Sequence, residues 1–108
     1  MRRHQVVWSE PARLDILGIV DYIASDSPLN AERILDRLEV RAATLDQFPE
    51  RGRVVPELHQ EGITTIRELI ERPWRIVYEF DGKIVSVIGV FDSRRHLQSI
   101  LMERFLQM

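Results

Sequence analysis

The chain has 108 residues, a formal net charge of -2 at pH 7 and no cysteine. Its length predicts a single domain over residues 1–108 that buries a hydrophobic core, and its 44% hydrophobic and 30% charged residues are typical of globular rather than disordered proteins. The lack of cysteine excludes disulfide bonds, thiol catalysis and cysteine-bound metal, and the net charge does not indicate a nucleic-acid binder. No apolar run approaches the roughly 20 residues that span a bilayer, so we expect a cytoplasmic protein without a membrane partner.

The N-terminal half predicts one short strand and a pair of helices. Residues 4–8 include an apolar run that indicates a strand. Ser9 and Ser27 are each followed within two residues by a proline, which is typical of a helix N-terminus because serine caps free N–H groups and proline lacks one. The first helix is predicted over about residues 10–25, with apolar residues at helical spacing: Leu14, Leu17, Val20 and Ile23, or alternatively Ile16 and Ile19.

The second helix is predicted from Pro28 to the residue before Pro49. Its apolar stripe comprises Ala31, Ile34, Leu35, Leu38, Ala42, Leu45 and Phe48. Because the connection at residues 26–27 is short, the two helices should form an antiparallel hairpin. We expect the apolar faces of this hairpin to pack on a sheet, and we expect a loop over residues 49–62.

Three antiparallel strands are predicted next, at residues 66–70, 74–80 and 83–91. All three runs are rich in β-branched and aromatic residues, which favour a pleated, half-buried surface. Asp81 and Gly82 stand between the second and third runs and tolerate the positive φ values of a tight hairpin turn.

A two-residue turn at Asp81 and Gly82 would pair Tyr78 with Val85 and Arg75 with Ile88. Because side chains alternate between the faces of a strand, one face of the sheet is predicted to be aromatic and apolar. That face contains Trp74, Ile76, Tyr78, Phe80, Val85 and Val87. The opposite face is mixed, with Arg75 near its middle, and is expected to stay partly open.

A terminal helix is predicted from Arg94 onward. Its apolar stripe comprises Leu97, Ile100, Leu101, Phe105 and Met108. This stripe either packs in the core or forms a surface for a partner. The element order is β-α-α-β-β-β-α, so the predicted fold class is a two-layer α+β domain with a mainly antiparallel sheet and the N-terminal helix hairpin on one face.

The usual catalytic signatures are absent from the sequence. It contains no glycine-rich phosphate loop, no His-x-x-x-His spacing and no nucleophile-elbow pattern. The three histidines, His4, His59 and His96, lie in separate segments. We therefore predict neither a metal site nor a cofactor.

Arginines are the candidate functional residues that the sequence does offer. Arg67 and Arg75 lie on predicted strands, while Arg94 and Arg95 follow the last strand. In one interpretation the strand arginines pair with acidic residues, namely Glu57, Glu68 or Glu79, because charged residues are rarely buried unpaired. In the other they join Arg95 on an open face that binds phosphate or an acidic partner.

Several segments together resemble the RelE/ParE toxin superfamily, in the family's order and over nearly the whole chain. They are Val7-Trp8-Ser9 with Ala12, FPERGRVVPEL at residues 48–58, IREL at 66–69, WRIVY at 74–78 and VFDSRR at 90–95. The resemblance implies the toxin of a bacterial type II toxin–antitoxin pair, neutralised by a small antitoxin. One branch cuts mRNA on the ribosome, using basic residues on the sheet and a C-terminal tyrosine or histidine. The ParE-like branch poisons DNA gyrase and cuts nothing itself.

The resemblance also aligns the residues on which the two branches differ. Arg75 matches a catalytic strand arginine of the nucleases, and Arg95 matches the arginine after their last strand. Ile66 and Glu68 occupy positions where nucleases carry further basic residues. The ParE-like branch is therefore favoured.

The positions of acid–base groups also favour the ParE-like branch. Leu101 stands where the nucleases have their terminal tyrosine, and Phe91 stands where some relatives have a histidine. Cutting RNA needs a proton acceptor and a proton donor as well as stabilisation of phosphate charge, and two arginines supply only the last. His96 could replace the missing group, which keeps the nuclease alternative open.

We therefore predict a non-enzymatic gyrase inhibitor whose partners are DNA gyrase and an antitoxin. The predicted partner-binding residues are Arg67, Arg75, Arg94, Arg95, Leu97, Leu101 and Phe105. Glu57 and Glu68 are assigned structural roles, in which they pair with an arginine and hold the loop to the sheet. The alternatives are a ribosome-dependent mRNA interferase that acts on mRNA through Arg75, Arg95 and His96, and a binding protein that kept the fold without toxicity.

Overall fold

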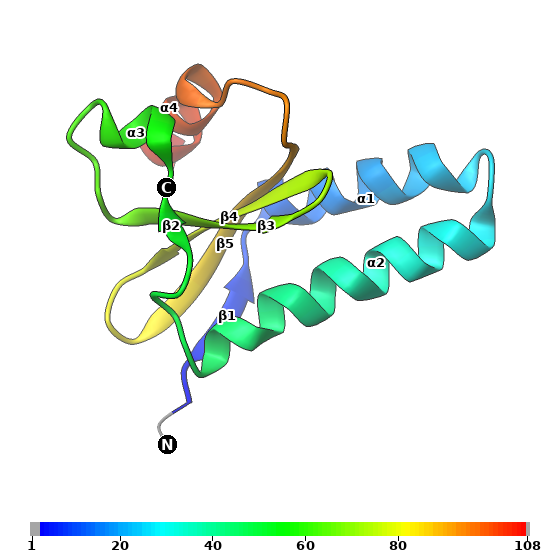
Figure 1. The fold of residues 1–108 in the computed structure, drawn as a ribbon, viewed down its shortest axis with the longest axis horizontal. Coiled ribbons are helices and arrows are strands. Elements are labelled where there is room, and N and C mark those ends of the chain that lie inside the picture. The colour runs from blue at the N-terminus through cyan, green and yellow to red at the C-terminus, as the bar shows by residue number, and fades with distance from the viewer. Residues whose placement is uncertain (1–2, 108) are drawn as a thin grey trace.

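The computed structural model describes residues 3–107 (Figure 1). Its elements are β1 (Gln5–Trp8), α1 (Glu10–Ala24), α2 (Pro28–Ala43), the 3₁₀ turn η1 (Thr44–Asp46), β2 (Arg53–Val54), α3 (Pro56–His59), β3 (Ile66–Glu71), β4 (Trp74–Phe80), β5 (Ile84–Asp92) and α4 (Gln98–Gln107). This order confirms the predicted α+β class. The predicted loop over residues 49–62 contains two elements that the sequence did not indicate, β2 and α3.

Both long N-terminal helices begin where the sequence predicts. The hydroxyl of Ser9 accepts the N–H of Ala12, and the hydroxyl of Ser27 accepts the N–H of Asn30, so each serine caps its helix. The terminal helix starts later than predicted, at Gln98 rather than at Arg94. Asp92 accepts the N–H of Arg94 in a turn, and this turn delays the helix.

The sheet is mixed, with strand order β1-β5-β4-β3-β2. The pairs β2–β3, β3–β4 and β4–β5 are antiparallel, while β1 runs parallel to β5. This confirms the mainly antiparallel sheet. The first and last strands in sequence are therefore neighbours at one side of the sheet.

The predicted register of the β4–β5 hairpin is wrong by two residues. Phe80 pairs with Val85 and Tyr78 pairs with Val87. The reason is the Asp81 carboxylate, which accepts the N–H groups of both Lys83 and Ile84 and so closes a longer loop than a two-residue turn. A shift of two residues keeps every side chain on its face, so the predicted aromatic face is confirmed.

A β-bulge changes the second half of β5. Val77 pairs with Gly89 while Tyr78 pairs with Val87, which leaves Ile88 as an extra residue. Arg75 consequently pairs with Phe91 and not, as predicted, with Ile88. The bulge changes which side chains of β5 face α1 beyond this point.

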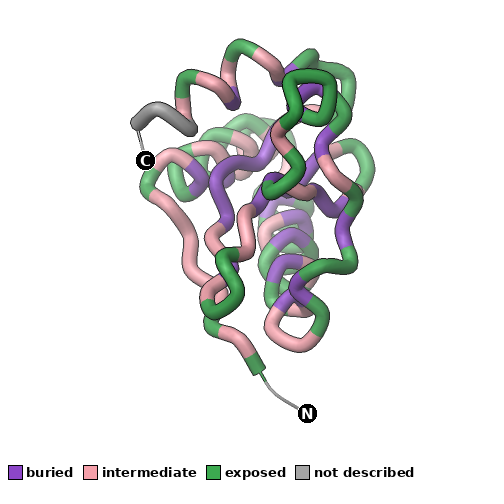
Figure 2. Tube along the Cα trace, turned by 90° about the vertical axis from the view of Figure 1, so that its left-hand side faces the viewer, coloured by how far each residue is buried: buried purple, intermediate pink, exposed green. Residues whose placement is uncertain are grey.

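Helices cover both faces of the sheet (Figure 1). The α1–α2 hairpin packs on the aromatic face, in a cluster that includes Ile16, Leu38, Ile76 and Tyr78. The opposite face, which we expected to be partly open, is covered by α3 and α4. That second cluster comprises Val55, Leu58, Ile66, Val77, Ile88, Phe91, Leu97 and Leu101. Figure 2 shows the buried residues in the interior, on the strands and on the inward turns of the helices.

Two predicted helix faces need correction. On α1 the alternative with Ile16 and Ile19 is right: Ile16 is buried, whereas Leu14 and Leu17 are 59% and 54% exposed. The α2 stripe is buried at most of its predicted positions, but Phe48 is exposed because α2 ends at Ala43 and the chain turns away after η1. No helix among residues 3–107 is long and apolar enough to cross a membrane.

Tyr78 fixes the loop before β2 to the sheet. Its buried hydroxyl accepts the N–H of Gly52 at 2.9 Å, and burial raises the pKa of this tyrosine. A Cβ at position 52 would lie 2.5 Å from the backbone oxygen of Glu68 and 2.7 Å from the tyrosine hydroxyl, so glycine is required there.

Tyr78→Phe should therefore lower the free energy of unfolding by about 1–3 kcal/mol, because it leaves a buried N–H without an acceptor. Urea titration followed by tryptophan fluorescence measures this change. Tyr22→Phe is the matched control, since Tyr22 is 83% exposed and surface changes stay within about 0.5 kcal/mol. Equal effects of the two variants would mean that the hydrogen bond contributes nothing.

Candidate functional site

Arg75 lies at the centre of a group of charges, called the ionic cluster below, in which Arg75, Glu57 and Glu68 are buried and Arg53 is exposed. Arg75 projects from β4, and its Nη1 and Nη2 each donate to a Glu57 carboxylate oxygen at 2.8 Å. Its Nε donates to Glu68 on β3 at 2.5 Å, and the other oxygen of Glu68 accepts from Arg53 at 2.7 Å. The exposed fractions of Arg75, Glu57 and Glu68 are 5%, 8% and 1%. The predicted acidic pairing of Arg75 is therefore confirmed.

Glu57 also connects this cluster to the C-terminal segment. One oxygen accepts the N–H of Leu97 at 2.9 Å, just before α4. The hydrogen bonds from Arg75 lower the pKa of Glu57 to about 2, against the opposing effect of burial. The same contacts raise the pKa of Arg75. Glu57 is thus ionised at neutral pH, and it joins α3, β4 and the start of α4 in the structural role that the sequence predicted for it.

The other predicted arginines lie elsewhere. Arg67 is half-buried and donates to the backbone oxygen of Gly52 at 2.8 Å. Arg94 is exposed and pairs with Asp92 at 2.9 Å, which lowers the pKa of that aspartate to about 2. Arg95 is exposed with its guanidinium 5.9 Å from the centre of the Phe91 ring.

The structure therefore divides the predicted site residues into two groups. Arg75 is inside, with its donors used by protein acceptors, one of them the backbone oxygen of Arg95 at 3.2 Å. The side chains of Arg94, Arg95 and His96 are exposed on the turn between β5 and α4. As a buried side chain, Arg75 does not present its charge to a partner in this conformation.

The predicted apolar contacts on α4 also lie inside. The exposed fractions of Leu97 and Leu101 are 0% and 1%, and both belong to the second core cluster. Core packing, rather than a partner surface, is therefore the right alternative for these two leucines. Phe105 falls outside the residues whose side chains the structure describes.

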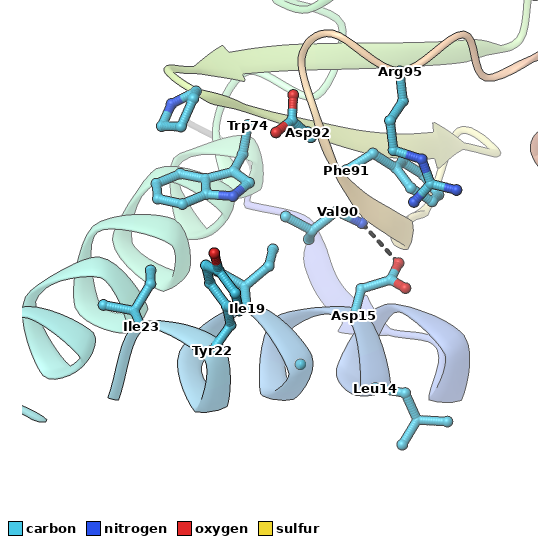
Figure 3. A pocket seen from close by; sticks show the side chains of 12 residues that line it. Leu14, Asp15, Ile19, Tyr22, Ile23, Trp74, Val90, Phe91, Asp92 and Arg95 are labelled. Carbon is cyan, nitrogen blue, oxygen red and sulfur yellow. Dashed lines mark hydrogen bonds between the residues drawn. The ribbon is translucent and has the colours of Figure 1, made fainter. Parts of the chain in front are cut away.

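A groove of about 580 Å³ lies between α1 and the adjoining ends of β4 and β5, and is called the α1 groove below (Figure 3). Its walls are largely apolar, with Ile19 and Tyr22 on the helix facing Trp74 and Val90 on the strands. Arg95 lies at one end. Sequence reasoning missed this groove, although apolar residues on two different faces of the first helix were a signal for it.

A second depression, of about 420 Å³, opens beside the ionic cluster. Its lining is polar and includes Arg53, Arg72, Arg75 and Ser93. Three of these side chains are cationic, but Arg53 and Arg75 already pair with Glu68. Among residues 3–107 no three histidine, aspartate or glutamate side chains converge closely enough to hold a metal ion.

Comparisons with known proteins place the chain in a family. Residues 6–97 match the sequence model of the ParE toxin of the type II toxin–antitoxin system parDE. The chain is 39% identical to Toxin RelE2 of Caulobacter vibrioides over 93 residues, which is 84% of this chain and 97% of that protein.

Solved structures share the fold. A chain of the chromosomal ParDE toxin–antitoxin system from P. aeruginosa is similar with a TM-score of 0.69 at 20% identity, over 83% of this chain and 96% of that one. A chain of the toxin–antitoxin complex RelBE2 from Mycobacterium tuberculosis is similar with a TM-score of 0.60 at 22% identity, over 85% and 93% of the two chains. The match over residues 6–97 and the 39% identity establish the relationship: the chain belongs to the ParE toxin family of type II toxin–antitoxin systems.

Proposed function

We propose that this toxin inhibits DNA gyrase, cuts no nucleic acid itself, and is neutralised by a cognate antitoxin. The observation that carries the proposal is that Arg75 is buried and paired with two carboxylates. Its guanidinium is held by two carboxylates in a buried cluster, so it would have to break both ion pairs before it could stabilise a phosphate.

The residues around Arg75 support the same conclusion. Glu68 brings a negative charge to the position where the resemblance to the nucleases implies a basic residue, and Ile66 beside it is apolar and buried. Phe91 and Leu101, at positions of expected acid–base groups, are buried core residues. Arg75 and the residues packed directly around it therefore offer neither an unpaired positive charge nor a proton-transfer group of the kind that RNA cleavage needs.

The α1 groove is the surface that we propose for the antitoxin. It combines a largely apolar lining with the exposed cation Arg95 at one end, so it fits a segment with apolar side chains and an acidic group. The two aspartates in the lining, Asp15 and Asp92, are already paired with Arg104 and Arg94. The structural neighbours come from toxin–antitoxin systems, ParDE and RelBE2, which supports a partner of this kind. Arg67 and Arg94 are proposed as further contacts for a partner.

Two assays on the purified protein test the proposed target. The first is supercoiling of relaxed plasmid by DNA gyrase with ATP, and the second is cleavage of mRNA on programmed ribosomes. Loss of supercoiling with intact mRNA is expected. Intact supercoiling together with cut mRNA would overturn the gyrase proposal, and in cells it would appear as a block of methionine incorporation before thymidine incorporation.

An mRNA interferase is the second candidate, because the 39% identical relative is named Toxin RelE2. The depression lined by Arg53, Arg72 and Arg75 is where phosphate would bind in that case. Arg95 and His96 follow on the exposed turn after β5, with His96 as the acid–base group. His96→Ala should then abolish mRNA cleavage, whereas a gyrase inhibitor should keep most of its effect on supercoiling.

Arg95→Ala should reduce toxicity more than Arg33→Ala, which removes an exposed cation from α2. We propose that gyrase, when no antitoxin is bound, also contacts Arg95, which lies on the exposed turn beside the groove and interacts with the Phe91 ring. Arg33 is far from this turn in sequence. We expect binding to the target to weaken at least about tenfold, the effect of losing roughly 1.4 kcal/mol of binding free energy, and survival after induction to rise. Colony counts at equal expression measure it, and equal toxicity of the two variants would contradict a role for Arg95.

A further inference from the structure

The outer edge of β5 is covered by a strand along only half of its length. β1 pairs with β5 from Ile84 to Val87, and the N–H of Ser9 then donates to the Val87 oxygen. From Ile88 to Asp92, β4 is the only strand beside β5 in the part of the chain that the structure describes. Such an edge carries unpaired backbone groups that can pair with another chain.

Two side chains take the place of a strand on this edge, and together they are called the edge pair. Asp15 on α1 accepts the N–H of Val90 at 3.0 Å (Figure 3). Arg104 on α4 donates to the backbone oxygen of Ile88 at 3.0 Å. The two side chains also form a two-pronged ion pair with each other, at 2.6 and 2.9 Å.

The surroundings of Arg104 hold it across this edge. Its guanidinium lies 4.7 Å from the centre of the Phe91 ring. A side chain at Gly89 would collide with that ring and approach the Arg104 Nη1 to 2.7 Å, so the glycine leaves the space that the guanidinium occupies. The side chains of Asp15 and Arg104 are 17% and 19% exposed. The pair is thus largely shielded from water.

The two side chains make the same kinds of hydrogen bond to β5 that a neighbouring strand would make. A neighbouring strand would offer an acceptor to the N–H of Val90 and a donor to the oxygen of Ile88. Asp15 and Arg104 offer the same acceptor and the same donor. An ion pair that only joined α4 to α1 would need neither backbone contact.

We propose that the edge pair keeps the half of β5 that no second strand borders from pairing with the same edge of a second copy of this chain. Two copies related by a two-fold axis can join identical edges in antiparallel register. The α1 groove is lined by this part of β5, so edge pairing would also bring its apolar lining toward the second copy. The inference does not rest on the proposed target, and its test does not use toxicity.

A charge swap separates this role from that of a simple link between helices. In Asp15→Arg combined with Arg104→Asp the ion pair can form again, but a donor then meets the N–H of Val90 and an acceptor meets the oxygen of Ile88. We expect the swap and Asp15→Leu both to shift the protein from monomer to dimer in light scattering coupled to size-exclusion chromatography. Arg37→Leu is the matched control, because Arg37 links α2 to Glu71 through an ion pair of 2.8 Å and touches no open edge. This variant should stay monomeric.

Amide hydrogen exchange at Val90 gives a second readout, and it can be measured on the unmodified protein as well as on the variants. Val90 should be protected in the monomer, and dilute Asp15→Leu should exchange it about 10- to 100-fold faster, the effect of losing a hydrogen bond to a charged group. Fast exchange at Val90 in the unmodified protein would overturn the proposal even if the variants fail to fold. A swap variant that is monomeric would also overturn it, because the pair would then serve only to hold α4.

Discussion

Arg75→Met should lower the free energy of unfolding by about 3–5 kcal/mol at pH 7, the usual cost of leaving buried charge uncompensated. Glu57 and Glu68 would lose the guanidinium that both share, while their carboxylates stay inside the protein. Methionine keeps the unbranched stem of the arginine side chain and removes its guanidinium, so most of the loss is electrostatic. Urea unfolding followed by tryptophan fluorescence measures the change.

The effect should depend on pH, with a sign set by Glu57. Its pKa is lowered in the folded state, from 4.5 to about 2, so its contribution is present above pH 4.5 and is lost as the pH falls toward 2. This shift corresponds to about 3 kcal/mol in the unmodified protein. In Arg75→Met the cause of the shift is gone. The difference between the two proteins should therefore be largest at pH 7, smaller at pH 3 and smallest near pH 2.

Arg37→Met is the control for this experiment. Arg37 also pairs with a glutamate at 2.8 Å, but its side chain is 49% exposed. Exposed ion pairs contribute about 0–1 kcal/mol, so this variant should unfold nearly as the unmodified protein does. If both methionine variants lose the same stability, the ionic cluster has no special structural role and the argument against a nuclease weakens with it.

Leu101→Ala should cost about 2–5 kcal/mol of unfolding free energy, the range for a buried leucine that leaves a cavity. Leu101 is 1% exposed and packs with Phe91 and Leu97 between α4 and the sheet. Because α4 carries this contact, hydrogen exchange should rise first in the helix. Urea titration measures the unfolding free energy, and hydrogen exchange on the same sample measures the opening of α4.

Leu17→Ala serves as the comparison, since Leu17 is 54% exposed on α1 and surface substitutions change stability by no more than about 0.5 kcal/mol. Comparing the two leucine variants tests whether the apolar stripe of α4 packs in the core or forms a surface for a partner. A Leu101→Ala variant that kept full stability but lost partner binding would make that residue a docking contact and not a core residue.

The faces of the hairpin were predictable from the sequence, but its register was not. Alternation assigns Trp74 and Tyr78 to one face whatever the loop length, provided that the shift is an even number of residues. The loop length depends on the Asp81 side chain, which accepts two backbone N–H groups. Composition indicates a turn at this place but does not decide which N–H groups the carboxylate receives.

The sequence predicted that Arg75 pairs with acidic residues but did not determine which glutamates pair with it. Arg75 on a strand needs an acidic partner, and Glu57 and Glu68 were both candidates. Glu68 reaches Arg75 from the neighbouring strand, whereas Glu57 reaches Arg75 because α3 forms within the predicted loop. A helix of four residues is too short to leave a periodic signal in the sequence.

The edge pair was beyond sequence reasoning altogether. Asp15 and Arg104 are separated by 89 residues, and each looks like an ordinary charge on a helix. The bulge at Ile88 also gives no local signal, yet it determines which backbone groups of β5 face the open edge. Contacts of this kind follow from the complete fold and not from any one segment.

The α1–α2 hairpin extends well past the ends of the strands, so its far end is supported by its own two helices (Figure 1). Ala12, Leu38 and Ala42 are fully buried against the sheet, whereas Tyr22 and Leu29 near the turn are 83% and 60% exposed. Local stability should therefore decline along the hairpin from the sheet to the turn. The turn at residues 25–27 can accept a fluorophore or a short inserted sequence without disturbing the ionic cluster, which makes it a convenient attachment point for following the protein as it binds a partner.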